Sequence, residues 1–273
     1  MAERATHRTQ PLVRTRPVMG TTASIHVFDA PATGAAHATD AAVAAAMDEV
    51  VGELDRLEAV FSTFRRDSQI SRINAGDLHL LDADAEVLDV LDACTWLEHA
   101  SGGAFRARRP DPPYALDPAG FVKGWATERA AQRLTDRGLR HWYVSVGGDV
   151  IAHGTPAMGR SWRVALADPR ASRQVVGVIE IDAGAVATSG TAERGAHIWD
   201  GRTDTPADVL ASLTVTGPSL AWADALATAA FALGAYGMTW LERFDDYAGI
   251  AVHGDGTITT TGAVAPAPPV LVA

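Results

Sequence analysis

A carboxylate and a hydroxyl stand four residues apart in segment 220–234, which is otherwise apolar on every side. This pattern predicts a buried helix with Asp224 and Thr228 on one face. A buried carboxylate without a partner is costly, so we expect a cation beside Asp224. Carboxylate and hydroxyl oxygens suit magnesium or calcium better than zinc. The alternative is that Asp224 pairs with an Arg or Lys while Thr228 bonds back to a helix carbonyl.

Two glycine-containing segments could approach a phosphate or another ligand. In segment 117–124 a proline and a glycine shape a turn ahead of a helix, which places Lys123 in the first helical turn. A helix N-terminus with a lysine suits a phosphate group, and a solvated lysine is the alternative. In segment 144–150 two glycines at a strand end allow either a hairpin turn or the close approach of a ligand.

Two further segments carry groups that could take part in chemistry. Segment 188–200 sets hydroxyls, a histidine and an aspartate together after a strand. Because imidazole titrates near neutral pH, His197 could act as a general base, and a structural or exposed histidine is the alternative. Segment 61–74 mixes aromatic and polar side chains and could cap a planar ring, or it forms a surface loop with capping serines.

The elements that must position these groups follow from hydrophobic periodicity. The pattern predicts helices at 41–60, 85–100, 122–137 and 220–235, strands at 22–28, 143–146, 162–167, 175–181, 185–188 and 210–215, and a closing hairpin at 249–252 and 257–261. Strands and helices in clusters favour an α+β or mixed α/β protein over a regular βαβ array. We expect one domain at 16–262, a flexible N-terminus at 1–15 and an Ala/Pro-rich tail at 263–273.

Composition excludes several classes of protein. The 273 residues are 47% hydrophobic and 21% charged, which is typical of a globular protein with a substantial core. A net charge of -10 argues against a nucleic-acid groove. No segment reaches the roughly 20 apolar residues of a membrane span, and the N-terminal residues lack a signal-peptide pattern, so we expect a cytoplasmic protein. The single cysteine, Cys94, lies in an apolar helical pattern and is predicted to be buried.

Taken together and in this order, the segments resemble the ApbE family of FAD:protein FMN transferases over about residues 19–252. The segments that carry the resemblance are 19–21, 61–64 with Ser68, Ser71 and Asn74, 102–105, 117–124, 147–149, 188–190, 197–200 and 223–228. The chain departs from the family pattern at Arg106, where an aspartate is usual, and after Asp200, where Gly201 and Asp204 precede Pro206.

The resemblance implies a fold and a set of site residues. The fold would be a single α+β domain with mixed, largely antiparallel sheets and packed helices. Magnesium would be held by Asp224, Thr228 and the backbone carbonyl of Gly120, and His197 would be the catalytic histidine. The residues implied to line the FAD site are Met19, Phe64, Ala104, Phe105, Asp117, Lys123 and Ile198.

The reaction implied by the resemblance is the transfer of FMN from FAD to a Ser or Thr hydroxyl within a short motif of an acceptor protein. Magnesium would neutralise the FAD diphosphate, His197 would take the hydroxyl proton, and AMP would leave. Two alternatives stay open. One is a metal-dependent FAD pyrophosphatase that releases FMN and AMP, and the other is a degenerate FAD-binding protein without turnover.

Overall fold

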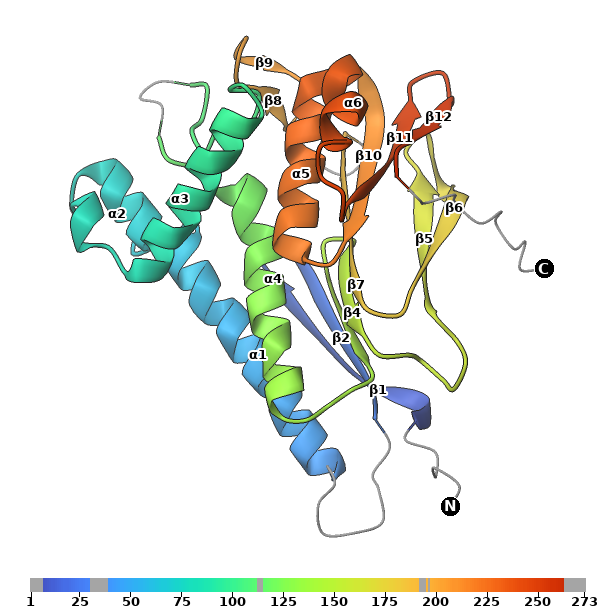
Figure 1. Cartoon of the computed structure of the whole chain (residues 1–273). Helices are drawn as coiled ribbons and strands as arrows, with labels where there is room; N and C mark the ends of the chain where they lie inside the picture. The colour runs from blue at the N-terminus through green and yellow to red at the C-terminus, as the bar shows by residue number, and fades with distance from the viewer. Residues whose placement is uncertain (1–6, 30–38, 112–114, 192–194, 196, 263–273) are drawn as a thin grey trace.

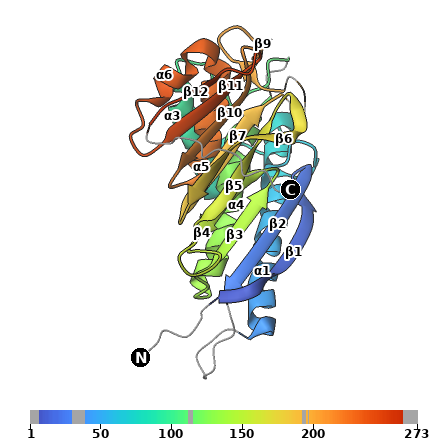
Figure 2. The same cartoon turned by 90° about the vertical axis from the view of Figure 1, so that its right-hand side faces the viewer.

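An eight-stranded sheet lies between a layer of helices and a two-stranded hairpin (Figures 1 and 2). The structure is a computed structural model, which describes residues 7–29, 39–111, 115–191, 195 and 197–262. Every strand pairing in these ranges is antiparallel. The single α+β domain predicted from the sequence is therefore confirmed.

The strands of the main sheet run in the order β1-β2-β3-β4-β7-β10-β11-β12, which Figure 2 shows face on. Their bounds are β1 His7–Val18, β2 Thr21–Asp29, β3 Trp142–Val146, β4 Asp149–His153, β7 Gly184–Gly190, β10 Leu210–Gly217, β11 Ala248–His253 and β12 Ile258–Thr260. The hairpin consists of β5 Trp162–Asp168 and β6 Ala171–Ile181, and a short pair is formed by β8 Trp199–Asp200 and β9 Thr205–Pro206.

The helices gather on the face of the sheet opposite the hairpin (Figure 1). They are α1 Asp40–Phe61, α2 Gln69–Ala75, α3 Ala85–Ala100, α4 Ala119–Asp136, α5 Leu220–Leu233 and α6 Gly237–Leu241, with 3-10 turns at Leu80–Asp82 and Gly234–Tyr236. Helix α5 packs on β7, β10 and α4, and α4 packs in turn on α1. The many alanines of α5 leave room for this close packing, so nearly every residue of the helix is buried.

Strand β7 supplies side chains to both sides of the sheet because alternate residues point to opposite faces. Ala185 and Ala187 join the main core on the helical side. Val186 instead packs with Ile250 of β11 against Leu166 of the hairpin, in a separate apolar cluster. This cluster fixes the hairpin over the face of the sheet opposite the helices (Figure 1).

A flexible segment was expected at 1–15; the structure contradicts this for residues 7–15, and residues 1–6 lie outside the described residues. Residues His7–Val18 form β1, which pairs with β2. The strand lacks a regular apolar alternation because it is an edge strand, and its Arg8, Arg14 and Arg16 form ion pairs with Asp40, Asp48 and Asp55. Prolines and charges are usual on such edges, where they hinder pairing with another chain. The predicted tail at 263–273 lies outside the described residues.

Helix α4 begins at Ala119, three residues before the predicted start at 122. Pro118 occupies the N-cap position, where a missing N–H group costs little. Lys123 is consequently the fifth residue of the helix and does not lie in its first turn as predicted. The other predicted helices and strands are present with shifts of up to four residues at their ends, and β1, β4, β8, β9, α2 and α6 were not predicted.

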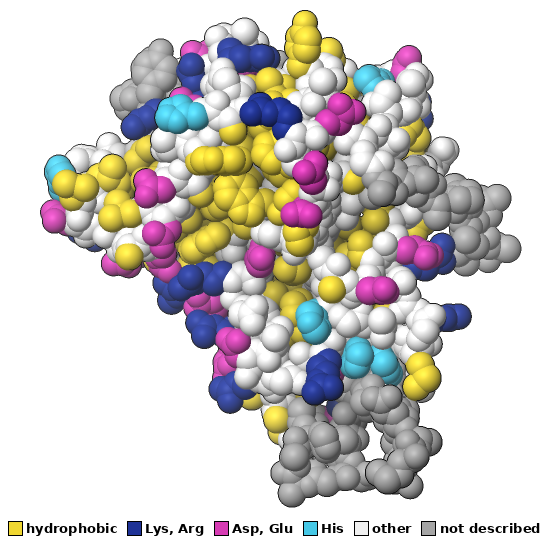
Figure 3. Space-filling model, viewed as in Figure 1, with side chains coloured by type: hydrophobic (Ala, Val, Ile, Leu, Met, Phe, Trp, Pro, Cys, Tyr) yellow, Lys and Arg dark blue, Asp and Glu magenta, His cyan; other side chains and the backbone are white. Residues whose placement is uncertain are grey.

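Hydrophobic side chains gather on the surface between α3 and α5 (Figure 3). There Trp96, 49% exposed, packs edge on against Trp222 and Phe244. Cys94 on the same helix is 2% exposed, which confirms its predicted burial. None of the described helices is long and apolar enough to cross a membrane.

Candidate active site

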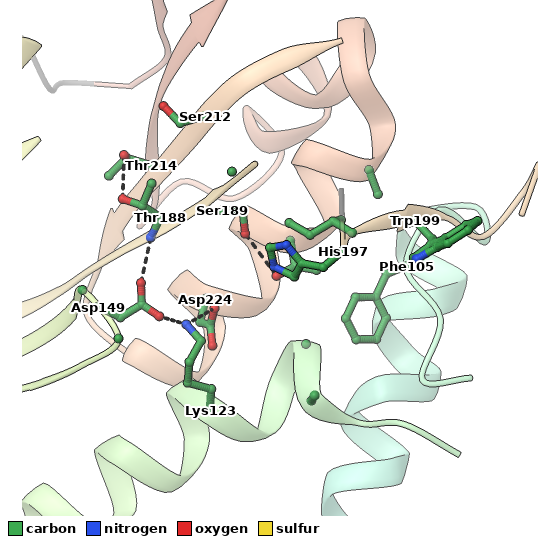
Figure 4. Close-up of a pocket in the computed structure, with 18 of the residues that line it drawn as sticks. Phe105, Lys123, Asp149, Thr188, Ser189, His197, Trp199, Ser212, Thr214 and Asp224 are labelled. Atoms are coloured by element: carbon green, nitrogen blue, oxygen red, sulfur yellow. Dashed lines mark hydrogen bonds and ion pairs between the residues drawn. The ribbon is translucent and has the colours of Figure 1, made fainter. Parts of the chain in front are cut away.

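A pocket of about 1330 Å³ opens between the hairpin, the adjoining strands of the main sheet, and helices α4 and α5. Nine of the eleven predicted site residues line it, although they come from segments far apart in the sequence. These nine are Phe64, Phe105, Asp117, Gly120, Lys123, His197, Ile198, Asp224 and Thr228. Figure 4 shows Lys123 and Asp224 on one side of the pocket, Phe105 and Trp199 on the other, and His197 between them.

The Lys123 ammonium joins two buried carboxylates at the base of the pocket (Figure 4). Lys123 Nζ lies 3.0 Å from Asp224 Oδ1 and also forms an ion pair with Asp149 Oδ2. The two aspartate side chains are 4% and 2% exposed, against 24% for the lysine. This is the lysine partner that the sequence left open as an alternative for Asp224, and burial makes such a partner necessary.

Helices α4 and α5 approach each other closely at Gly124, which lets Asp224 reach the backbone of α4. The Gly124 N–H donates to Asp224 Oδ2 at 2.9 Å. A Cβ atom at Gly124 would stand only 2.5 Å from the carbonyl oxygen of Leu220. One at Gly120 would stand 3.3 Å from Thr228 Cγ2, so the predicted ligands Gly120 and Thr228 are neighbours.

Hydroxyl groups of β7 face both sides of the sheet at the pocket. Ser189 Oγ lies 3.2 Å from Thr228 Oγ1, on the helical side. Thr188 points the other way, and its hydroxyl pairs at 2.8 Å with that of Thr214. The alternative expectation for Thr228, a hydrogen bond back to a helix carbonyl, is not borne out within the described residues. Thr228 instead meets a second hydroxyl oxygen across the pocket.

The His197 side chain is exposed in the pocket, and its orientation is fixed by the backbone nearby. Nδ1 lies 2.9 Å from the carbonyl oxygen of Gly195. A carbonyl oxygen only accepts, so Nδ1 carries the hydrogen of this bond. In the neutral imidazole, Nε2 then holds a lone pair and can accept a proton.

One wall of the pocket is apolar and aromatic. Phe105 and Ile198 are almost fully buried there, whereas Trp199 is 39% exposed and Phe64 is 95% exposed. Burial of the first two follows from their contacts with the main core, of which both are members. Such a wall suits a planar ring system, which buries its faces against apolar groups.

Two predicted residues, Met19 and Ala104, do not line the pocket. Met19 lies in the turn between β1 and β2 with φ 51° and packs against the core. Ala104 is fully buried, and its carbonyl oxygen accepts a hydrogen bond of 2.9 Å from Gly201.

Asp117 is positioned by a hydrogen-bonded connection to the segment at 61–74. The Asn74 side chain donates to the Leu116 carbonyl at 2.9 Å and accepts from the Leu116 N–H at 2.8 Å. Asp117 itself accepts from the Ala119 N–H at the start of α4. In the same segment Ser68 caps α2, as the capping-serine alternative expected, while Phe64 lines the pocket.

The two departures from the family pattern are neighbours in space. Arg106 Nη1 lies 3.4 Å from Asp204 Oδ1, and a Cβ atom at Gly201 would clash with the Arg106 side chain. The arginine and the residues that follow Asp200 thus form one connected unit at the pocket edge. Replacing Arg106 or Asp204 with an uncharged residue would leave the remaining charge without this partner.

The oxygen atoms around Asp224 fit a hard divalent cation. A carboxylate, the Thr228 and Ser189 hydroxyls and the carbonyl-bearing turn at Gly120 stand together, and a single ammonium faces two buried carboxylates. No cluster of three or more His, Cys, Asp or Glu side chains that could hold a metal occurs in the described residues. Magnesium commonly takes one or two carboxylates, with water and substrate phosphates completing its coordination, so a small protein set is sufficient.

Sequence reasoning did not assign several groups that line the pocket. Asp149 and Ser189 lie in segments that were singled out, but neither was given a role. The hairpin wall, including Val164 and Leu166, carries no chemical signal in the sequence. Its strands were predicted, yet their place over the pocket depends on tertiary packing.

Comparison with known proteins identifies relatives of the chain. A FAD:protein FMN transferase from Vibrio cholerae is 30% identical over 55% of this chain and 48% of the relative. One from Treponema pallidum is 27% identical over 81% of this chain and 78% of the relative. The chain thus spans about half the length of the first of these curated relatives.

The fold is shared with solved structures. The flavin transferase ApbE from Vibrio cholerae superposes with a TM-score of 0.77 over 92% of this chain and 96% of that chain, at 22% identity. The model of the ApbE family matches residues 19–108 and 106–251, which is most of the sequence. The chain therefore belongs to the ApbE family.

Proposed function

We propose that the chain transfers FMN from FAD to a Ser or Thr hydroxyl of an acceptor protein, with magnesium, and releases AMP. The observation that carries this proposal is the single pocket that gathers an oxygen-rich cation site, a lysine, a histidine and an aromatic wall. The names of the relatives agree with this transfer. The acceptor motif and the cytoplasmic location remain predictions.

Asp224, Thr228 and the Gly120 carbonyl are the groups that would hold magnesium. When bound, the ion supplies positive charge that neutralises the FAD diphosphate. Lys123, whose ammonium stands beside Asp224, would contribute a second positive charge toward the same phosphates. A diphosphate in a protein of net charge -10 needs such local cations.

The apolar wall would orient the substrate. Phe105 and Ile198 offer buried surface to a planar ring, and Phe64 and Trp199 offer exposed aromatic surface nearer the solvent. Asp117, which precedes α4 and lines the same pocket, would accept a hydrogen bond from a hydroxyl or amino group of the nucleotide. Fixing both ends of FAD places the phosphorus that is attacked.

His197 would act as general base on the acceptor hydroxyl. Its Nδ1–H is held by Gly195, which leaves Nε2 to accept the hydroxyl proton as the oxygen attacks the FMN phosphorus. The bond between that phosphorus and the bridging oxygen of AMP breaks, and AMP carries away the bonding electrons. Water in place of the hydroxyl would give the pyrophosphatase alternative.

The experiment incubates the purified chain with FAD and Mg²⁺, with and without a domain that bears a Ser/Thr flavinylation motif. AMP, free FMN and acceptor mass are followed together. AMP with acceptor-linked FMN supports the transferase, whereas AMP with free FMN indicates the hydrolase. FAD that stays intact and bound would point to the degenerate FAD-binding protein without turnover.

Two variants test the residue roles. Asp224→Ala should abolish magnesium-dependent turnover, because a charged ligand is lost, and unchanged Mg²⁺ dependence would remove Asp224 from the site. His197→Ala should lower turnover by about 10²–10⁴-fold while FAD binding is largely kept. A large loss of FAD affinity at a normal rate would make His197 a binding residue instead.

A further inference from the structure

The Lys123 ammonium occupies the approach to Asp224 that a metal ion would use. Asp224 Oδ2 is engaged by the Gly124 N–H, so Oδ1 is the oxygen that faces the ammonium, at 3.0 Å. Two like charges cannot share this oxygen in a buried site without strong repulsion. A cation that binds Asp224 must therefore move the lysine away from it.

Asp149 offers the lysine a second carboxylate in its immediate reach. Its side chain is 2% exposed, and Oδ1 accepts a hydrogen bond of 2.9 Å from the Thr188 N–H. Oδ2 is buried and has no hydrogen-bond partner in the described part of the chain apart from its ion pair with Lys123. The carboxylate is thus fixed to β7 at one oxygen and presents the other to the ammonium.

The turn before β4 sets Asp149 in this position. Val146 and Asp149 pair across a two-residue Gly147-Gly148 turn, whose φ angles are 59° and 88°. Glycine adopts two such positive angles in succession at no steric cost, and a turn of this kind matches the twist of a hairpin. The aspartate is therefore held by the backbone on both sides and does not depend on a flexible loop.

We propose that Asp149 is a positioning residue, which holds the Lys123 ammonium away from Asp224 Oδ1 when a divalent cation binds there. Without Asp149, the lysine has Asp224 as its remaining carboxylate partner and competes with the cation for it. The inference rests on the proposed cation site at Asp224. Cation affinity would then depend on Asp149, although this residue does not contact the ion.

The test measures binding of Mn²⁺, as a spectroscopic probe for the divalent cation, to the full chain without FAD or acceptor. Asp149→Asn keeps an oxygen for the Thr188 N–H but loses the charge that attracts the lysine. We expect its Mn²⁺ affinity to fall by on the order of tenfold, the effect of one compensated charge contact. Asp168→Asn is the matched control, because Asp168 lines the same pocket at 5% exposure but pairs with Arg170.

A double-mutant cycle separates action through the lysine from a direct effect of charge. Lys123→Met alone should bind Mn²⁺ about tenfold more tightly, because the competitor is gone. In that background, Asp149→Asn should change the affinity by less than about threefold. An unchanged affinity in the single variant, or an undiminished effect in the Lys123→Met background, would overturn the proposal.

The outcomes also distinguish this inference from the proposed function. Asp224→Ala should lose Mn²⁺ binding, and a variant that binds normally would refute the cation site itself. Absence of Mn²⁺ binding by the wild-type chain would refute both the cation site and the role of Asp149. If Asp149→Asn does not fold, Lys123→Met decides alone, since unchanged or weaker binding there contradicts competition by the lysine.

Discussion

Replacing Gly124 with alanine tests whether the close approach of α4 and α5 positions the candidate cation site. The added methyl would stand 2.5 Å from the Leu220 carbonyl oxygen and 2.7 Å from Asp224 Cβ. Neither neighbour is the end of a flexible side chain, so rotation cannot relieve the contact. Carbon atoms pack at about 3.5–4.0 Å, so α5 must move by roughly 1 Å.

The expected change in the free energy of unfolding combines two opposing contributions. Overpacking of this kind costs about 1–3 kcal/mol, while alanine gains up to about 1 kcal/mol over glycine in a helix. When the full alanine gain applies, the net loss is up to about 2 kcal/mol, which corresponds to a fall in Tm of up to roughly 4 °C for a chain of this size. Because Asp224 moves with α5, Mn²⁺ binding and turnover should fall by up to about 100-fold.

The assay combines thermal unfolding with Mn²⁺ binding, and Gly52→Ala serves as the control. Gly52 lies within α1, is exposed and has no heavy atom within 4 Å of an added Cβ. Its replacement should stabilise the protein by about 0.5–1 kcal/mol through helix propensity alone. If Gly124→Ala instead equals or exceeds the wild-type Tm and binds Mn²⁺ normally, the packing argument is refuted.

Three other substitutions or treatments probe features outside the cation site. Hydrogen bonds from Arg56 lower the pKa of Glu53 to about 2 from its usual 4.5. The ionised Glu53 side chain therefore stabilises the folded protein above pH 4.5, and this contribution is lost as the pH falls toward 2. Glu53→Gln should therefore lower the unfolding free energy by about 1–2 kcal/mol at pH 7 and by little near pH 2, and a deficit that persists in acid would contradict this. Burial raises the pKa of the Cys94 thiol to about 12, so a thiol reagent should label it at the rate of unfolding, and fast labelling of the native protein would show that the thiol is accessible. Asn74→Ala removes both hydrogen bonds to Leu116 and should raise the KM for FAD while costing about 1–3 kcal/mol, whereas an unchanged KM would separate this connection from the site.

Local sequence patterns were sufficient for most of the secondary structure. Helix α3 has the predicted bounds, because its apolar spacing is regular and polar turns flank it. Strand β1 was missed because an exposed edge strand with charges and prolines lacks the alternation that reports a buried face. The start of α4 was misplaced because proline is compatible with a helix N-terminus and does not forbid an earlier start.

The sequence by itself determined the residue types, the α+β class and the shared face of Asp224 and Thr228, because helical spacing is a local property. It left open which partner Asp224 would have. Tertiary structure decided that Lys123 of α4 meets both Asp224 of α5 and Asp149 of β4. Such contacts depend on the order of strands and on how closely two helices pack, and neither is encoded in the spacing of residues along one segment.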